Sequence, residues 1–197
     1  NSYISLGKDV EHRNRGITGR VFPGNKVLDA GSGFGNMSKT ALKLCDGKIS
    51  ITLYDPLVPM LKNTGTHFEK VPDLVNGVFE HIPFKNEEFD AVTVSFGVRN
   101  FETLDKGLSD MCRVLKQNGS LVVLEFSKPT NPIFSRLYWF YFKFILPPLG
   151  RLFSKDATAY TYLPQSVAAF PEGKNFENIL AKVGYKDISS TLVSGGI

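Results

Sequence analysis

The chain has 197 residues, with 42% hydrophobic and 21% charged residues, as in an ordinary globular protein. We expect one domain, residues 1–197, because this length can bury a sizeable core. The net charge of +4 comes from scattered bases, which argues against a nucleic-acid partner. We see no signal peptide and no apolar run that could span a bilayer. Two cysteines and three separated histidines lack metal-ligand spacing, so we expect a cytoplasmic protein without a metal.

The first predicted elements are a loop and helix within residues 1–20, a strand at 26–30 and a helix from about Asn36 to Leu44. Between strand and helix lies a turn with glycines at 31, 33 and 35, which lets a ligand approach the backbone closely. Asp29 precedes this turn and would repel a pyrophosphate but attract a cation. S-adenosylmethionine (SAM), with its ammonium and sulfonium, therefore fits better than NAD. The alternative is a structural turn in which Asp29 caps the helix.

A second strand is predicted at 49–54 and ends in Asp55, and Pro56 can open a helix that runs to about Asn63. A carboxylate at this position can accept hydrogen bonds from a ribose diol, which both SAM and NAD carry. The glycine spacing is G-x-G-x-G rather than the dinucleotide pattern G-x-G-x-x-G. Asp55 thus indicates an adenosine ligand, and the spacing again favours SAM.

Strands and helices go on alternating, which predicts an α/β fold with a parallel sheet and helices on both faces. The remaining elements are a weak strand at 74–78, a central strand at 90–96, a helix at 104–115, a turn at 118–119, a strand at 120–126, a helix at 175–183 and a strand at 187–193. Ligands of such sheets bind at the carboxyl ends of the strands, where Asp29, Asp55, Ser95 and Glu125 fall.

Four stretches resemble the quinone-biosynthesis C-methyltransferases, and the resemblance runs from Asn1 to about Gly196. They are VSFGVRN at 94–100, LEFSKP at 124–129, ILPPLG at 145–150 and DATAYTYLPQS at 156–166. The resemblance implies a class I, Rossmann-like sheet whose last, antiparallel strand would follow Gly195-Gly196. It also implies SAM as methyl donor and a prenylated hydroquinone, demethylmenaquinol or the ubiquinol precursor, as acceptor.

The resemblance to this family and the interpretation of the glycine turn as a SAM site together predict a set of cofactor-binding residues. These are Asp29, Gly31, Ser32, Gly33, Gly35, Ser38, Asp55, Pro56, Val78, Phe79 and Ser95. One pair departs from the family, which has Asp or Asn beside Ala where this chain has Val78-Phe79. We therefore expect the adenine to be held by backbone groups or by stacking on Phe79.

Methylation of a hydroquinone carbon needs a developing phenolate oxygen to be stabilised and a ring proton to be removed. We expect Arg99 to stabilise the phenolate and Asn100 to orient the ring oxygen. Glu125 is either the base or the partner of Arg99, and a structural ion pair of Arg99 with Glu125 or Asp156 is the alternative. Tyr160 and Tyr162 are candidate substrate-binding residues, or else packing residues.

Residues 130–165 interrupt the alternation with an aromatic, proline-marked insertion. We expect it to cover the active site and to guide a prenyl tail; a packed helix without that role is the alternative. Its bases Arg136, Lys143, Arg151 and Lys155 would face an anionic membrane, which suits peripheral contact at the inner face of the membrane. A homodimer is a further expected partner state. The rival functions are a class I methyltransferase for another small molecule or lipid, a non-catalytic SAM- or nucleotide-binding module, and an NAD oxidoreductase.

Overall fold

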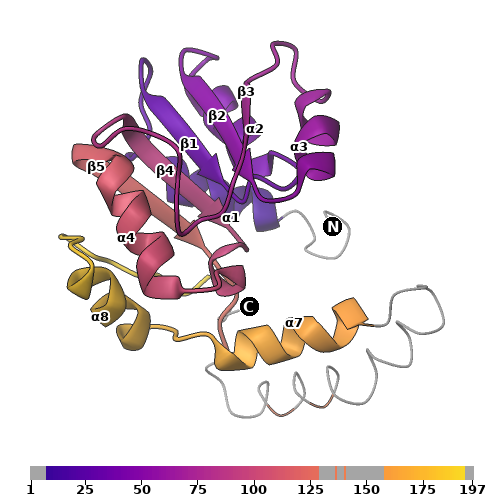
Figure 1. Cartoon of the computed structure of the whole chain (residues 1–197), viewed down its shortest axis with the longest axis vertical. Coiled ribbons are helices and arrows are strands. Elements are labelled where there is room, and N and C mark those ends of the chain that lie inside the picture. The colour runs from indigo at the N-terminus through magenta and orange to yellow at the C-terminus, as the bar shows by residue number, and fades with distance from the viewer. Residues whose placement is uncertain (1–7, 129–135, 137–139, 141–157, 194–197) are drawn as a thin grey trace. The chain divides into compact units, whose positions relative to one another are not determined.

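A computed structural model describes residues 8–128, Arg136, Phe140 and 158–193 (Figure 1). The chain divides into two compact units. One is Asn1–Glu125 with Leu180–Lys186, and the other is Phe126–Ile179 with Asp187–Ile197. The expectation of a single domain over 1–197 stays a prediction. Most of the predicted insertion, 130–165, lies outside the described residues.

The first unit contains a five-stranded parallel sheet, which confirms the predicted α/β architecture. Its strands are β1 (Lys26–Ala30), β2 (Ser50–Asp55), β3 (Asp73–Asn76), β4 (Phe89–Ser95) and β5 (Leu115–Leu124). They lie in the order β3-β2-β1-β4-β5, so the direction of winding reverses between β1 and β4. A ligand crevice is expected beside such a switch point, at the carboxyl ends of the strands.

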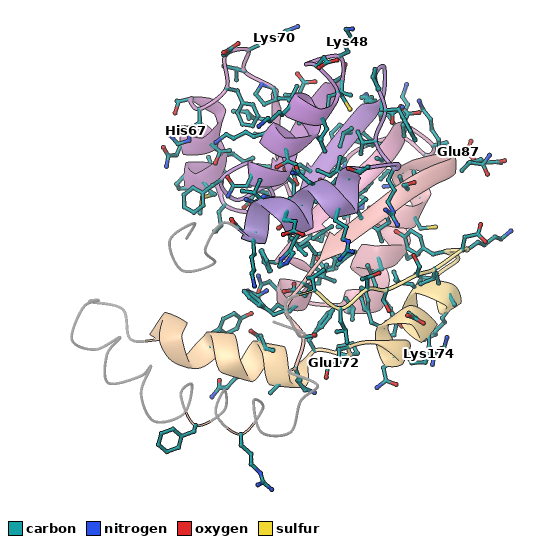
Figure 2. The ribbon with its side chains drawn as sticks, turned by 180° about the vertical axis from the view of Figure 1, so that it is seen from behind. Lys48, His67, Lys70, Glu87, Glu172 and Lys174 are labelled. Atoms are coloured by element: carbon teal, nitrogen blue, oxygen red, sulfur yellow. The ribbon has the colours of Figure 1, made fainter. Side chains whose placement is uncertain are left out.

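Helices lie on both faces of the sheet, as Figures 1 and 2 show from opposite sides. α1 (Lys8–Ile17) and α2 (Asn36–Leu44) lie on one face, and α4 (Leu104–Val114) lies on the other. The other described helices are α3 (Val58–Gly65), the short 3₁₀ helix η1 (Val98–Asn100), α7 (Thr158–Ala169) and α8 (Lys174–Lys182). The predicted helices at 36–44, 104–115 and 175–183 are thus confirmed to within a residue.

The core of the first unit lies around the two central strands. Leu28 and Ala30 of β1 and Val92 and Val94 of β4 are completely buried, because helices cover both faces of a central parallel strand. Apolar side chains of α1 and α2 pack against the sheet in one cluster that includes Ile17, Met37 and Ala41. This packing holds β1 and β4 rigidly beside one another, at the switch point.

Two predicted element starts and one predicted strand were wrong. The helix after β2 begins at Val58 rather than Pro56, because the Leu57 amide donates to Asp55 Oδ1 at 2.9 Å and forms a turn first. β5 begins at Leu115, and the predicted turn lies inside it as an irregularity at Asn118, where φ is 63°. Residues 187–193 are described without a strand. The expected neighbour of that strand would follow Gly195-Gly196, outside the described residues.

Gly35 precedes α2 with φ at 67°, and a Cβ there would lie 2.9 Å from Phe68 and from Thr64. We expect Gly35→Ala to lower the free energy of unfolding by about 1–3 kcal/mol, from left-handed strain, with the collision adding to it. Gly47→Ala is a matched control, because Gly47 has φ at 72° but nothing within 4 Å of a Cβ. Urea unfolding would measure both. Equal losses would contradict a contribution from the collision.

Candidate active site

The glycine loop crosses from the end of β1 toward β2. The amides of Gly31 and Ser32 donate to the Tyr54 carbonyl at 2.7 and 3.2 Å. Gly31, Gly33 and Gly35 have φ of 66°, 51° and 67°, which L-residues rarely adopt, so the loop needs glycine at all three positions. A Cβ on Gly31 would lie 3.4 Å from the Phe79 ring. The backbone of the loop is therefore closely packed on one side.

Asp29 is fully buried beneath this loop and is engaged within the protein. Its Oδ2 accepts hydrogen bonds from Ser38 Oγ at 2.6 Å and the Ser38 amide at 3.2 Å, and its Oδ1 accepts one from Thr93 Oγ1 at 2.9 Å. Burial raises the pKa of Asp29 to about 6, although these hydrogen bonds oppose the shift. Asp29 thus caps the third residue of α2 and ties β1 to β4. This arrangement matches the capping alternative, and binding of a ligand ammonium stays a prediction.

Asp55, at the end of β2, lies against the same loop. Its Oδ2 accepts a hydrogen bond from the Gly33 amide at 3.1 Å, and the residue is 6% exposed. Asn76, at the end of β3, donates from Nδ2 to the carbonyls of Asp55 and Pro56 at 2.9 Å each. Asn76 was not among the predicted site residues, although a polar side chain at the carboxyl end of a strand is a signal for such a residue. The structure brings Asp55 and the glycine loop together.

The loop after β3 carries Val78 and Phe79, and the two side chains differ sharply in exposure. Val78 is 55% exposed, and its carbonyl accepts a hydrogen bond from Tyr54 Oη at 2.6 Å. Phe79 is buried and stacks on Phe101, with ring centroids 4.4 Å apart and an interplanar angle of 20°. Because Phe101 covers one face of the Phe79 ring, this geometry argues against adenine stacking on Phe79.

β4 ends at Ser95, and the chain then turns sharply. Phe96 has φ at 56°, which is strained for a bulky residue, and its amide donates to the Leu124 carbonyl at 2.7 Å. The turn brings Gly97 close to the glycine loop, since a Cβ on Gly97 would lie 3.9 Å from Gly31 Cα. The sequence analysis had not singled out Phe96 as a strained position. Its strain lies at the switch point, between Ser95 and η1.

Arg99 of η1 forms a buried ion pair with Glu125, just beyond β5. Arg99 Nη1 contacts Glu125 Oε1, and the two side chains are 10% and 5% exposed. The Arg99 amide also approaches Glu125 Oε2 at 3.4 Å. Of the two roles left open for Glu125, the structure thus shows the ion-pair partner. Asn100 is exposed, and Asp156 lies outside the described residues.

Known proteins resemble the chain over its full length. The model of the ubiE/COQ5 methyltransferase family matches residues 1–197. The chain belongs to this family. The demethylmenaquinone methyltransferase of Bacteroides fragilis is 36% identical over 100% of this chain and 82% of its own length. The ubiquinone/menaquinone biosynthesis C-methyltransferase UbiE of Citrifermentans bemidjiense is 37% identical over 100% of this chain and 86% of its own.

Solved structures confirm the Rossmann-like methyltransferase fold of this family member. A SAM-dependent methyltransferase of Thermotoga maritima has a TM-score of 0.62 and 17% identity, covering 90% of this chain and 72% of that one. An arsenic(III) SAM methyltransferase of Chlamydomonas reinhardtii has a TM-score of 0.62 and 20% identity, covering 86% and 54%. The predicted recognition of the family, the fold class and the methyltransferase activity are therefore confirmed.

In the glycine loop of this methyltransferase, the hydroxyl of Ser32 is a buried side-chain group without a hydrogen-bond partner among the described residues. Ser32 is 7% exposed, and its buried Oγ makes no hydrogen bond within the described part of the chain. An unpaired buried hydroxyl costs free energy, so such groups usually meet a ligand or a water. Ser32 Oγ lies in the loop expected to hold SAM, and its free capacity fits a polar cofactor there.

The substrate-binding predictions fall in the second unit. Tyr160 and Tyr162 both belong to α7. Tyr162 is 51% exposed. Of the four bases expected to face a membrane, Arg136 is described and exposed, whereas Lys143, Arg151 and Lys155 lie outside the described residues.

Within 8–128 and 158–193, no group of three or more His, Cys, Asp or Glu could hold a metal ion. Among the helices that are described, none has both the length and the apolarity needed to cross a membrane. The expectation that this methyltransferase needs no metal stays a prediction.

Proposed function

We propose that the protein uses SAM to methylate a ring carbon of a prenylated hydroquinone, demethylmenaquinol or the ubiquinol precursor. The printed names of its relatives, with 36–37% identity over the whole chain, support this substrate class. The assignment of SAM as the cofactor rests on the Asp55 carboxylate, which accepts a hydrogen bond from the Gly33 amide at 3.1 Å. This contact supports a role for Asp55 as the acceptor for a ribose diol, and the neighbouring Asp29 disfavours a pyrophosphate.

The cofactor would lie across the carboxyl ends of β1, β2 and β4. When bound, SAM supplies an electrophilic methyl group. Ser32 offers its unpartnered hydroxyl, and Asp55 has lone pairs beyond those that accept the Gly33 and Leu57 amides. Val78 offers an exposed apolar surface to the adenine, in place of the buried Phe79. The remaining members of the proposed set are Asp29, Gly31, Gly33, Gly35, Ser38, Pro56 and Ser95.

Arg99 and Glu125 divide the catalytic work in this proposal. Glu125 holds the guanidinium of Arg99 through their buried ion pair, so the side chain loses little freedom when substrate binds. Arg99 then stabilises the negative charge that develops on the ring oxygen, and Asn100 orients that oxygen. Because Glu125 is engaged with Arg99, a water molecule is the better candidate for removal of the ring proton.

We expect Asp55→Ala to weaken binding of SAM and of its demethylated product, S-adenosylhomocysteine, at least tenfold, which is about 1.4 kcal/mol. The substitution removes the ribose acceptor and the bond to the Gly33 amide. Isothermal calorimetry measures the affinity. Asp73→Ala, at the exposed start of β3, is the matched control and should bind normally. Binding of NAD as tight as that of SAM would contradict the assignment.

A turnover assay separates the proposed function from its rivals. The purified protein is given SAM with a labelled methyl group and either demethylmenaquinol or the demethylated ubiquinol precursor. We expect label on a ring carbon of at least one of them. Label only on some other lipid or small molecule would favour another class I methyltransferase. Binding of SAM without any product would favour a non-catalytic module. Profiling the quinones of cells that lack the gene would show the demethylated species that accumulates.

The expected surroundings of the enzyme belong to the same proposal. A prenylated hydroquinone resides in a membrane, so its methylation calls for peripheral contact with the inner face of that membrane, through the 130–165 insertion with Arg136. Tyr160 and Tyr162 would contact the ring or the tail. A homodimer remains a prediction for measurement in solution.

A further inference from the structure

A continuous path of packed groups links the glycine loop to α4. A Cβ on Gly31 would lie 3.4 Å from Phe79 Cζ, so the Phe79 ring lies directly against the loop backbone. The face of the Phe79 ring stacks on Phe101, with ring centroids 4.4 Å apart. Phe101 lies in turn on Gly107 of α4, where a Cβ would fall 2.5 Å from Phe101 Cδ2. The step from Phe101 to Gly107 leaves no room for a Cβ, whereas a Cβ on Gly31 would be in ordinary van der Waals contact with Phe79.

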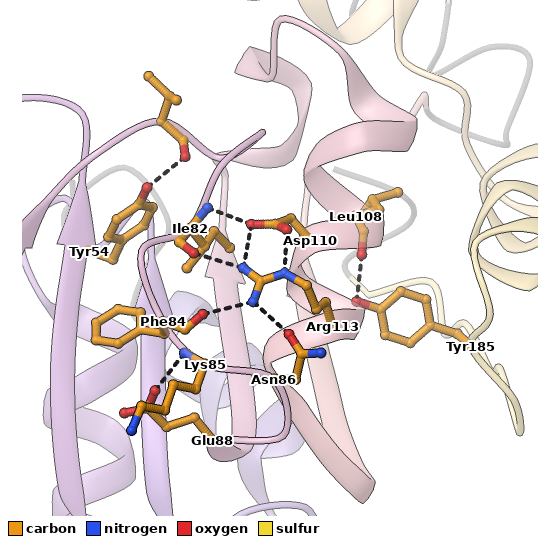
Figure 3. A network of polar contacts seen from close by, with 11 residues as sticks. Tyr54, Ile82, Phe84, Lys85, Asn86, Glu88, Leu108, Asp110, Arg113 and Tyr185 are labelled. Atoms are coloured by element: carbon orange, nitrogen blue, oxygen red, sulfur yellow. Dashed lines mark hydrogen bonds and ion pairs between the residues drawn. The ribbon is translucent and has the colours of Figure 1, made fainter.

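The loop that carries Phe79 is fastened on both sides. Upstream, Tyr54 Oη donates to the Val78 carbonyl, and burial raises the pKa of Tyr54 to about 12, so it stays a donor. Downstream, the Ile82 amide donates to Asp110 at 2.5 Å, and Arg113 Nη2 donates to the Ile82 carbonyl at 2.8 Å (Figure 3). Arg113 also donates to the carbonyl of Phe84 and the side chain of Asn86. Phe79 is thus held between β2 and α4.

The segment that carries Arg99 and Asn100 rests on the cofactor site at both of its ends. At one end, Gly97 lies close to Gly31. At the other, Phe101 follows η1 directly, donates from its amide to the Val98 carbonyl and stacks on Phe79. Thr103, two residues on, donates from its amide to Glu80 Oε1 at 3.0 Å. A three-residue helix has little stability of its own, so these flanking contacts decide where it lies.

We propose that Phe79 and Phe101 are positioning residues that couple occupancy of the glycine loop to the placement of Arg99. The inference rests on the proposed function. A ligand against Gly31 and Val78 restricts the backbone on which Phe79 lies, and Phe79 passes that restriction through the stacked Phe101 to η1. In this proposal the Phe79 ring acts on η1, the segment that carries Arg99 and Asn100, through its contact with Phe101.

The test replaces Phe101 with leucine and follows η1 by hydrogen exchange. S-adenosylhomocysteine is the probe. In the wild type we expect it to slow exchange of residues 97–103 by about tenfold, and in Phe101→Leu we expect no such protection. Turnover at saturation should fall by about ten- to a hundredfold, as for a misplaced catalytic group, while the Kd of the probe changes less than about threefold.

Phe84→Leu is the matched control, because Phe84 forms an aromatic pair with Phe89 at 4.9 Å that lies off the path. It should lose stability and yet keep both the protection of 97–103 and normal turnover. If Phe101→Leu does not fold, Gly107→Ala displaces the Phe101 ring from the other side and should give the same loss of turnover. Gly16→Ala is its control, a helical glycine packed on Val122.

The outcomes separate the inference from the function beneath it. If the wild type does not bind S-adenosylhomocysteine, both the proposed function and the inference fail. If the wild type binds it and methylates a hydroquinone, but exchange at 97–103 does not respond, the coupling alone is overturned. Full turnover in both Phe101→Leu and Gly107→Ala would overturn it equally. Protection and turnover lost together, with affinity kept, support it.

Discussion

Arg99→Ala should lose both stability and turnover, and the two losses have different causes. The Arg99 and Glu125 side chains are 10% and 5% exposed, so removing the guanidinium leaves a buried carboxylate without its partner. Breaking such a pair costs about 3–5 kcal/mol of stability. Loss of the charge that faces the developing phenolate raises the barrier by about 2–4 kcal/mol, as for one oxyanion donor.

A double variant separates these two effects. Arg99→Met with Glu125→Gln replaces the ion pair by neutral groups of similar size, so it should recover most of the lost stability. It should not recover turnover, because no cation faces the ring oxygen. Arg99→Lys should rescue little, since a point charge does not reproduce the guanidinium fork that Glu125 holds. Urea unfolding, turnover at saturation and calorimetry with S-adenosylhomocysteine measure the three quantities.

The affinity for the cofactor decides whether Arg99 belongs to catalysis or to the scaffold. We expect every folded variant of the pair to bind S-adenosylhomocysteine within about threefold of the wild type. Turnover restored in the double variant would show that Arg99 serves the structure alone. An affinity that collapses in Arg99→Ala while turnover at saturation survives would also exclude the phenolate role.

Local patterns predicted the sheet and the glycine loop well. The strand at 26–30 and the helix at 36–44 were predicted at their observed bounds, because a buried strand, a glycine turn and a helix follow one another within 20 residues. Gly31, Gly33 and Gly35 do have the positive φ that their sequence suggested. The parallel direction of the strands followed from the alternation, and with it the edge of the sheet at which Asp29 and Asp55 lie, whereas the order of the strands was not predicted.

Contacts between distant residues could not be predicted in the same way. Thr93 donates to Asp29 from 64 residues away, and this bond, together with Ser38, makes Asp29 a buried structural carboxylate. Phe79 stacks on Phe101, which lies 22 residues farther along the chain and covers one face of its ring, and the expected contact of Phe79 with adenine stays a prediction. Neither the contact of Asp29 with Thr93 nor that of Phe79 with Phe101 can be predicted from the periodicity of the local sequence. Packing of one carboxyl-end loop against the next decides both.

Boundary errors arose where a single contact overruled a propensity. Pro56 can begin a helix, yet Asp55 accepts the Leu57 amide and delays the first turn to Val58, which leaves Pro59 near the start. Asn118 adopts a left-handed conformation, as a turn residue should, but pairing with β4 continues around it. The residue types indicated a helix start and a turn, but contacts with neighbouring segments determined where each element begins.

Asp29→Asn should change the pH dependence of stability by about 3 kcal/mol. Burial raises the pKa of Asp29 from 3.8 to about 6 in the folded protein. Between these two values the folded state binds more protons than the unfolded state, so Asp29 makes unfolding easier as the pH rises from about 4 to about 6. Asparagine does not titrate. Its Oδ1 can accept from Ser38, and its amide can donate to the hydroxyl of Thr93.

The stability of Asp29→Asn relative to wild type should therefore increase from about pH 4 to about pH 6 and be constant above it. Carboxylates that do not interact with Asp29 cancel in this difference, whereas the charge of Asp55 interacts with that of Asp29 and contributes to it. Asp110→Asn is a control of opposite sign. Burial alone would raise the pKa of Asp110, but hydrogen bonds from Arg113 and Ile82 outweigh it and lower that pKa. Its variant should be less stable at neutral pH, with a deficit that disappears as the pH falls.

Urea unfolding at half-unit steps from pH 3.5 to pH 7.5 would record both differences. A flat difference between wild type and Asp29→Asn would mean that Asp29 titrates alike in both states, and so that water reaches its carboxylate. Calorimetry with SAM on the same variant addresses its other predicted role. If the ammonium of SAM contacts Asp29, the affinity falls although the fold is stabilised. If the affinity for SAM is unchanged, Asp29 has a structural role only, in which its hydrogen bonds hold α2 and β4 beside the glycine loop.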